Sequence, residues 1–185
     1  YFRGTSGHNT IRIDGLDQSD PRGPFLWGYK AEAYLKNRAQ SERFEKVSGY
    51  HTGYARLKSP VIHSRGITLD KLNRVIVIDD SISSKAGHHI EQFFHLHPDC
   101  TLERAGKHLF EISNGNVVLT MEIDKYFDAY VFNGSESPVA GWYSGRFGEK
   151  QKTITICNRV YSKGSRNFIT KIYLSSLNRL DRKEK

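Results

Sequence analysis

Short segments in which apolar and polar residues alternate recur along this chain, and turn-forming residues separate them. Such segments cover residues 9–14, 50–57, 60–69, 72–79, 89–97, 108–112, 116–123, 126–132, 152–160 and 167–174. Ser113-Asn114-Gly115 is a strong hairpin signal between two of them. About ten strands, with turns roughly every 8–12 residues, predict an all-β fold, an antiparallel β-sandwich of about ten or more strands.

Three segments depart from simple alternation. Residues 72–79 end in an apolar run that is typical of a strand buried on both faces. Residues 31–40 have the composition of a helix, although tertiary contacts can turn such a segment into a strand. Residues 175–185 are polar and charged, so we expect one sandwich domain over residues 1–174, followed by a charged tail.

The composition narrows the function only in part. The 185 residues include 28 Lys and Arg against 20 Asp and Glu, which gives a formal net charge of +8. A basic surface attracts polyanions such as nucleic acid, anionic lipid or acidic polysaccharide, but it is as typical of a solvated face. No apolar stretch approaches the ~20 residues that span a bilayer, so we expect no membrane insertion. Two cysteines, Cys100 and Cys157, are too few for a disulfide scaffold, and whether they pair stays open.

Two polar clusters have residue types that could do chemistry. His95, His97 and Asp99 would share one face of a strand and could bind a metal ion together, but Pro98 disturbs the strand, and a polar sheet face explains them better. Asp79 and Asp80 are adjacent, so they point to opposite faces and cannot form the carboxylate pair of a glycosidase. No phosphate-binding loop and no nucleophile with an adjacent base is recognisable.

Aromatic and arginine residues are candidates for binding sugars. Aromatic faces can stack on sugar rings, and Arg pairs with carboxylate or sulfate groups. On this basis we predict Trp27, Trp142 and Arg146 as substrate-binding residues, with Tyr143 and Phe147 as further candidates. Packing in the core or in a loop is the alternative for each aromatic residue.

The first residues of the chain also resemble a known motif. Arg3-Gly4-Thr5, His8-Asn9-Thr10, Asp14-Gly15 and Gln18-Ser19 match the pattern R-G-T-x-x-H-N-T-v-x-v-D-G-x-x-Q-S. The chain resembles, in this pattern, the heparinase II/III-like polysaccharide lyases. Later segments agree with the family in order, over nearly the whole chain: His51 to Leu57, Pro60 to Arg65, Ile78 to Asp80, His89 to Leu96 and Gly141 to Ser144.

The resemblance implies that the chain is most of a C-terminal antiparallel β-sandwich domain that follows an N-terminal (α/α) toroid. The family cleaves acidic, uronate-containing polysaccharides such as heparan sulfate or alginate by β-elimination. Its catalytic Tyr and Asn lie on the toroid, and its catalytic His lies upstream of the present Tyr1. We therefore expect no catalytic residue in this chain, not even His51, Tyr54 or His63, and no activity when the chain is isolated. The expected partners are the toroid and an acidic polysaccharide.

The resemblance also implies a metal. Several family members hold zinc in the sandwich with a His and an Asp from upstream and a His from the H-N-T segment, which is His8 here. Imidazole and carboxylate groups are suitable zinc ligands. We therefore expect a structural zinc ion that is bound by His8 and by residues upstream of this chain, and weak or no zinc binding by the chain alone.

Two other functions stay open. A non-catalytic carbohydrate-binding or scaffold domain linked to exopolysaccharide metabolism would have the same fold, and the sequence upstream would distinguish it from a lyase. Nucleic-acid binding rests only on charge and aromatic content, without a binding motif, so we expect no nucleic-acid partner. The family is usually periplasmic or secreted, and we expect that location here, although the first residues lack the pattern of a signal peptide.

Overall fold

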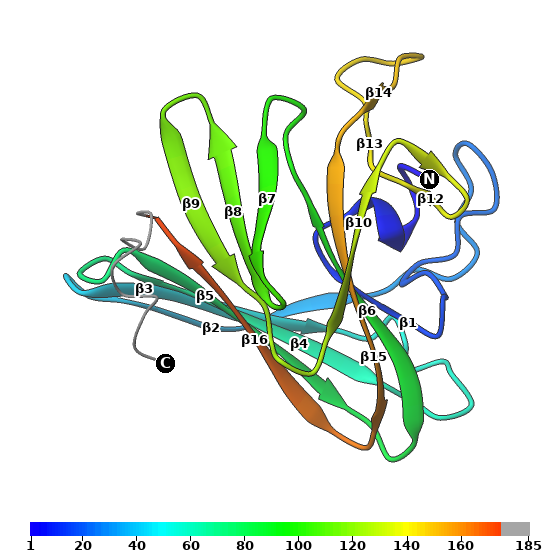
Figure 1. The fold of residues 1–185 in the computed structure, drawn as a ribbon. Helices are drawn as coiled ribbons and strands as arrows, with labels where there is room; N and C mark the ends of the chain where they lie inside the picture. The colour runs from blue at the N-terminus through cyan, green and yellow to red at the C-terminus, as the bar shows by residue number, and fades with distance from the viewer. Residues whose placement is uncertain (175–185) are drawn as a thin grey trace.

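The computed structural model describes residues 1–174, which form two antiparallel β-sheets packed against each other (Figure 1). The large sheet has eight strands in the order β2 (Ala33–Gln40), β3 (Phe44–His51), β4 (Ile62–Asp70), β5 (Val75–Ser83), β16 (Arg166–Tyr173), β9 (Val117–Glu122), β8 (Leu109–Asn114) and β7 (Thr101–Gly106). The small sheet has four, in the order β1 (Ile11–Ile13), β6 (Gly87–His95), β15 (Ile154–Lys163) and β10 (Asp128–Asn133). The predicted all-β sandwich is confirmed.

Several short elements gather at one end of the molecule. They are the 3-10 turn η1 (Thr5–Gly7), the hairpin β11 (Ser135–Glu136) and β12 (Val139–Ala140), and the hairpin β13 (Trp142–Tyr143) and β14 (Gln151–Lys152). Figure 1 shows them near the N-terminus, beyond the ends of β6 and β15. Within residues 1–174, no helix is long and apolar enough to cross a membrane. The predicted tail, residues 175–185, lies outside the described residues.

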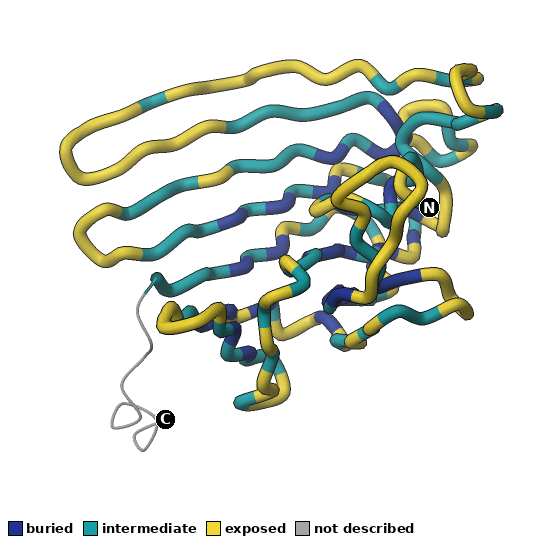
Figure 2. Tube along the Cα trace, turned by 90° about the horizontal axis from the view of Figure 1, so that it is seen from above, coloured by how far each residue is buried: buried dark blue, intermediate teal, exposed yellow. Residues whose placement is uncertain are grey.

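The core lies where the two sheets face each other. Alternate residues of the large sheet point inward and meet alternate residues of the small sheet, and Figure 2 shows most of the buried positions in this region. The inward side chains that are completely buried include Ile11, Ile13, Phe110, Ile156 and Phe168. Burial of such a side chain stabilises the fold by about 1.5–3 kcal/mol relative to leaving it exposed.

The hairpin predicted at Ser113-Asn114-Gly115 is present. Asn114 on β8 pairs with Val117 on β9, so the connection has two residues, Gly115 and Asn116. Gly115 has φ +56°, a left-handed conformation that glycine adopts without a Cβ penalty. The turn chemistry therefore fixes the register of these two strands.

Other expectations need correction. Residues 31–40 do not form a helix: Ala33–Gln40 is strand β2, because pairing with β3 satisfies its backbone groups. Residues 72–79 are not buried on both faces, since β5 alternates between buried and half-buried positions. The predicted run over residues 50–57 is interrupted, because β3 ends at His51 and the chain then turns.

The inner face of the large sheet extends beyond the small sheet. Val47 and Ile67 lie opposite each other in register, and Ile67 lies opposite the buried core residue Ile78. Nevertheless Leu35, Val47 and Ile67 are 71%, 42% and 38% exposed. The small sheet thus covers only part of the large sheet, and the hairpin of β2 and β3 projects beyond it (Figure 2).

We predict that Phe168→Ala destabilises the fold severely, because Phe168 is fully buried and its ring centroid lies 4.5 Å from that of Phe127. The expected loss in the free energy of unfolding is about 3–5 kcal/mol. Urea denaturation followed by circular dichroism measures it. Phe147→Ala removes the same atoms from a fully exposed site and should change stability by less than about 0.5 kcal/mol. Equal effects of the two substitutions would contradict the assignment of the core.

Candidate functional site

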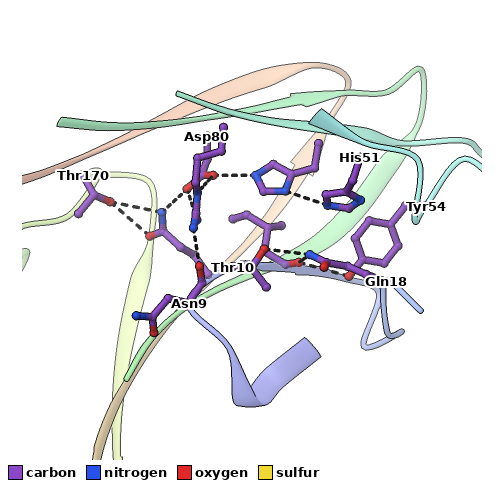
Figure 3. A network of polar contacts seen from close by, with 11 residues as sticks. Asn9, Thr10, Gln18, His51, Tyr54, Asp80 and Thr170 are labelled. Carbon is purple, nitrogen blue, oxygen red and sulfur yellow. Dashed lines mark hydrogen bonds and ion pairs between the residues drawn. The ribbon is translucent and has the colours of Figure 1, made fainter. Parts of the chain in front are cut away.

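A fully buried carboxylate, Asp80 on β5, is the centre of a polar network inside the sandwich (Figure 3). Its Oδ1 accepts hydrogen bonds from His63 Nε2 and from Arg65 Nε, each at 2.7 Å. Its Oδ2 accepts hydrogen bonds from Arg65 Nη2 and from Gln92 Nε2, each at 2.8 Å. A buried charge is tolerated only when it is paired and fully hydrogen-bonded, and this carboxylate meets both conditions.

Strand register brings these groups together. Arg65 on β4 lies directly opposite Asp80, and His63 lies two residues away on the same face of β4. Gln92 belongs to β6 of the small sheet, and its Oε1 accepts a hydrogen bond from Asn158 of β15 at 2.9 Å. The network therefore links the two sheets through polar side chains within an otherwise apolar core.

Two histidines extend the network toward the surface. His63 Nδ1 lies 3.1 Å from His51 Nε2, and the backbone N–H of Gly53 donates to His51 Nδ1 at 3.1 Å. Because His51 Nδ1 accepts, a neutral His51 has its proton on Nε2 and donates it to His63 Nδ1. His63 then has its proton on Nε2 and donates it to Asp80. Both ring nitrogens of each histidine are therefore engaged.

The environment shifts the titration of this chain of groups. Burial alone raises the pKa of Asp80, but the hydrogen bonds from His63 and Arg65 outweigh it and hold the pKa well below the usual range. Burial, with smaller contributions from His63 and Arg65, lowers the pKa of His51 to about 4. At neutral pH, Asp80 is thus ionised and His51 is neutral.

The network also fixes the H-N-T segment, His8-Asn9-Thr10. Arg65 Nη1 donates to the carbonyl of Asn9, and the amide of His95 donates to Asn9 Oδ1 at 2.7 Å. Gln18 Nε2 donates to Thr10 Oγ1 at 2.9 Å. The backbone and side chains around His8 are held from several directions, and the same ionised Asp80 anchors Arg65.

His8 itself is exposed, and it lies close to His95 at the end of β6. Burial and the proximity of His8 lower the pKa of His95. His95 Nδ1 is 2.8 Å from Thr155 Oγ1, and its Nε2 is buried near the carbonyls of Ser6 and His8 without a hydrogen bond of good geometry. Two imidazoles are thus neighbours at this end of the sandwich.

His95, His97 and Asp99 do not come together as the metal cluster that the sequence left as the weaker alternative. Strand β6 ends at His95, and His97 and Asp99 lie in the turn that follows, where Nδ1 and Oδ2 are 3.4 Å apart. Among residues 1–174, no group of three or more His, Cys, Asp or Glu side chains could hold a metal ion. Within the described residues, His8 therefore belongs to no such group.

The predicted sugar-binding tryptophans lie in loops and hairpins near the same end. The guanidinium of Arg3 stacks over the ring of Trp27 at 4.4 Å, which joins the loop of Trp27 to the first residues. Trp142 on β13 donates from Nε1 to the Ser135 carbonyl at 2.9 Å, and Lys150 Nζ lies 3.9 Å from its ring centroid. Both rings are half-buried and already packed on one side by a cation.

Close backbone packing fixes the position of Trp142. Gly141, the residue before it, has φ +75°, and a Cβ there would lie 2.7 Å from the amide nitrogen of Gly134. Arg146 and Phe147 lie in the exposed loop between β13 and β14. The hairpin thus contains a positioned ring, Trp142, and its loop contains an exposed arginine, Arg146.

Both cysteines are free. Cys100 is half-buried and Cys157 is buried, and burial raises the pKa of Cys157 to about 11. The chain therefore contains no disulfide within the described residues, and Cys157 is an inert thiol at neutral pH.

A sequence profile described as heparinase II/III-like, C-terminal, matches residues 1–172. The chain belongs to this family. No curated protein sequence matches the chain significantly.

Solved structures of heparinases have the same fold as this heparinase II/III-like domain. A heparinase III is 15% identical, with a TM-score of 0.72 over 95% of this chain. A second heparinase III is 16% identical, with a TM-score of 0.72 over 97% of this chain. The heparan sulfate lyase HepC from Pedobacter heparinus is 12% identical, with a TM-score of 0.71 over 93% of this chain. The matched regions are 25%, 25% and 24% of those chains, so this chain spans about a quarter of their length.

Sequence reasoning did not find the buried network of the heparinase II/III-like domain. His51 and His63 stood out only as members of matching segments, and Asp80 was considered only as half of a carboxylate pair with Asp79. His51 was expected in an uninterrupted extended run. The one available signal is Asp80 itself, a charged residue at an inward position of an apolar strand, which requires partners. Those partners could not be named without the register of β4 against β5.

We predict that the stability of the domain falls as the pH falls from about 6.5 to about 4, because unfolded His51 takes up a proton that folded His51 resists. The lowered pKa of His51 corresponds to about 3 kcal/mol in the free energy of unfolding. This stability is fully present above pH 6.5 and is lost as the pH falls to about 4. His51→Gln, which keeps a donor toward His63, should flatten the dependence in this range. Urea denaturation at a series of pH values measures it.

The matched control is His97→Gln, because His97 is exposed in a turn. It should retain the slope of the unsubstituted chain. If the stability of His51→Gln depended on pH as steeply as that of the unsubstituted chain, the assignment of His51 as buried and neutral would be wrong. A separate loss of stability is expected at still lower pH, when Asp80, whose pKa is depressed, becomes protonated.

Proposed function

We propose that this chain is the β-sandwich part of a longer polysaccharide lyase that cleaves acidic, uronate-containing polysaccharides by β-elimination. The match of residues 1–172 to the heparinase II/III-like family is the observation on which this rests. It is supported by structural neighbours described as heparinase III and heparan sulfate lyase, which are about four times as long. The N-terminal part of such a lyase, a toroid, is the proposed intramolecular partner.

The reaction requires three things: neutralisation of the uronate carboxylate, removal of the C5 proton, and protonation of the departing O4 oxygen. A general base must have a free lone pair within reach of the proton it removes. His51 and His63 have both ring nitrogens engaged, and the hydroxyl of fully buried Tyr54 donates to the Leu16 carbonyl at 3.0 Å. These groups support a structural role, with catalytic residues outside this chain.

The role proposed for this chain is to bind the polymer. Arg146 can pair with a carboxylate or sulfate group, and the rings of Trp27 and Trp142 can lie against sugar rings. All three belong to segments outside the sheet strands that form the core, and two of them share one hairpin and its loop. We propose them as substrate-binding residues at one wall of the cleft.

A structural zinc ion is part of the proposal. His8 is exposed, and His95 beside it has a buried ring nitrogen without a good hydrogen bond, so the local chemistry suits a metal that other residues complete. Because residues 1–174 hold no complete ligand set, the remaining ligands must come from elsewhere in the longer protein. When bound, the zinc would fix the H-N-T segment. A periplasmic or secreted location is proposed from the family.

We predict that His8→Ala lowers the zinc content of the longer protein. After extensive dialysis, the unsubstituted protein should retain about one zinc per chain, as a structural site does. Mass spectrometry of the metal content measures it. His97→Ala removes an exposed histidine of a nearby turn and should leave the zinc content unchanged. Equal zinc in the His8 variant and the unsubstituted protein would remove His8 from the ligand set.

The lyase proposal is tested by incubating the longer protein with heparan sulfate, alginate, hyaluronan and a native exopolysaccharide. Ultraviolet absorbance follows the unsaturated uronate product. We expect a rise with at least one substrate, and none with the 185-residue chain alone. Within the active protein, Trp142→Ala and Arg146→Ala should raise KM by about tenfold while changing kcat less, because they bind rather than react.

A folded longer protein that releases no product from any of these polymers would favour the alternative function, a non-catalytic carbohydrate-binding or scaffold domain. The engaged histidines and buried tyrosine of this chain are compatible with that alternative as well. Product formation by the 185-residue chain itself would contradict the assignment of catalysis to other parts of the protein.

A further inference from the structure

The outer face of the large sheet has a hollow that the proposed cleft does not include. Its volume is about 490 Å³, within the usual range for small-ligand sites. Strands β2 to β5 and β16 form its floor and sides, on the side of the sheet away from Asp80 and the core. The polar side chains that line the hollow are Lys36, Asn37, Lys46, Ser48, Ser64, Thr68, Asp79, Ser81 and Asn167.

The hollow exists because its floor is made of small residues. Gly66, Ser48 and Ser64 occupy adjacent positions of β3 and β4, where a solvated sheet face normally has long charged side chains. A Cβ on Gly66 would meet only the Cβ atoms of Asp79 and Ser48, each at 3.9 Å, so the space above it is open. A flat ring could therefore approach the backbone closely at this point.

The polar groups of the floor are not used by the fold. Within residues 1–174, the side chains of Ser48, Ser64, Ser81 and Asn167 make no hydrogen bond to other residues of the chain. Each hydroxyl can donate and accept, and the amide can do both through separate atoms. Together they offer the mixture of donors and acceptors that the hydroxyl groups of a sugar need.

Charge favours an acidic ligand here. Lys36 lies at the bulge of β2, and Lys46 lies on the neighbouring strand β3. Asp79 is the one acidic residue of the lining, and its pKa is raised by burial and by the neighbouring charge of Asp80, against the effect of Lys46. The two lysines thus exceed the acidic charge, and each ammonium can contact a carboxylate or sulfate group.

An aromatic pair adjoins the hollow. Tyr34 and Tyr50 are opposite each other in register, with ring centroids 5.1 Å apart and planes inclined by 22°. Tyr50 is also opposite Ser64, so the two rings share the face that contains the hollow. A sugar chain that leaves the hollow along β3 would pass over these rings.

We propose that this hollow is a second glycan-binding site, which takes an acidic sugar residue of the polymer between Lys36 and Lys46 over the floor around Gly66. This second site rests on the proposed function, which supplies the class of ligand, but binding at the site requires no catalysis. The site lies on the face opposite the buried network, so it would hold the polymer apart from the loops that contain Trp142 and Arg146.

The first test measures binding of heparan sulfate and alginate oligosaccharides to the 185-residue chain by calorimetry, at low ionic strength. Lys36→Gln combined with Lys46→Gln should weaken binding by about tenfold or more, because two charge-assisted contacts are lost. The matched control is Lys107→Gln combined with Lys163→Gln, which removes the same charge from exposed positions outside the hollow. Binding should also weaken with added salt, which screens exposed charges.

A second variant keeps the net charge and fills the space. Gly66→Val adds a β-branched side chain to a strand, a position that such side chains favour. Its Cβ would make only ordinary van der Waals contacts, with the Cβ atoms of Asp79 and Ser48. It should leave the urea midpoint unchanged or raised, while weakening oligosaccharide binding by about tenfold, since the floor is blocked. An unfolded chain cannot give this combination of results.

Equal weakening by the two double variants would overturn the proposal, because it would reduce binding to net charge. Unchanged binding in Gly66→Val would overturn it too, as would an equally tight, equally substitution-sensitive interaction with DNA. No binding of either oligosaccharide by the folded chain would also overturn it. Lyase activity of the longer protein is a separate measurement, so a lack of cleavage with intact binding at the hollow would reject only the catalytic proposal.

Discussion

The buried charge of Asp80 is the constraint on which the rest of this domain depends. A carboxylate without solvent must be paired, and removing one partner of such a pair typically costs about 3–5 kcal/mol. Here the partners come from β4 and from the small sheet, so the charge sets the register of one sheet and its docking on the other. Arg65, the principal partner, also holds the carbonyl of Asn9. The group that keeps the core charge satisfied therefore also positions the segment containing His8.

Local signals in the sequence predicted the sheets well and the polar site poorly. The hairpin at Gly115 follows from residues that are neighbours along the chain, and so does the alternation of the core strands. Residues 33–40 have helical composition but form β2, because strand pairing with β3 outweighs a weak local preference. The Asp80 network joins residues 51, 63, 65, 80 and 92, whose proximity depends on register across two strand pairings and on the packing of the two sheets. No local pattern contains that information, although the H-N-T motif did identify the segment that the network supports.

Histidine alone is a poor indicator of chemistry in this domain. His51 and His63 extend the hydrogen bonds of Asp80 in a row that ends at the backbone amide of Gly53. A base must have an available lone pair, and neither ring has one. His8 and His95 differ, because one is exposed and the other has a buried nitrogen without a good partner. Satisfaction of hydrogen bonds, more than residue type, separates the structural histidines from the ligand candidates.

The two proposed contacts with glycan differ in what holds them in place. The floor of the hollow is set by the register of β3, β4 and β5, so its hydroxyl groups are positioned before any ligand arrives. Preorganised groups lose little conformational freedom on binding, whereas an exposed loop side chain such as Arg146 must be ordered. In the proposed hollow, Lys36 and Lys46 attract the acidic groups of a glycan, and the fixed hydroxyl groups of the floor add contacts that a polyanion without sugar hydroxyls at these positions lacks. The two proposed sites therefore differ physically: one is a rigid surface of paired strands, and the other is a set of loop side chains.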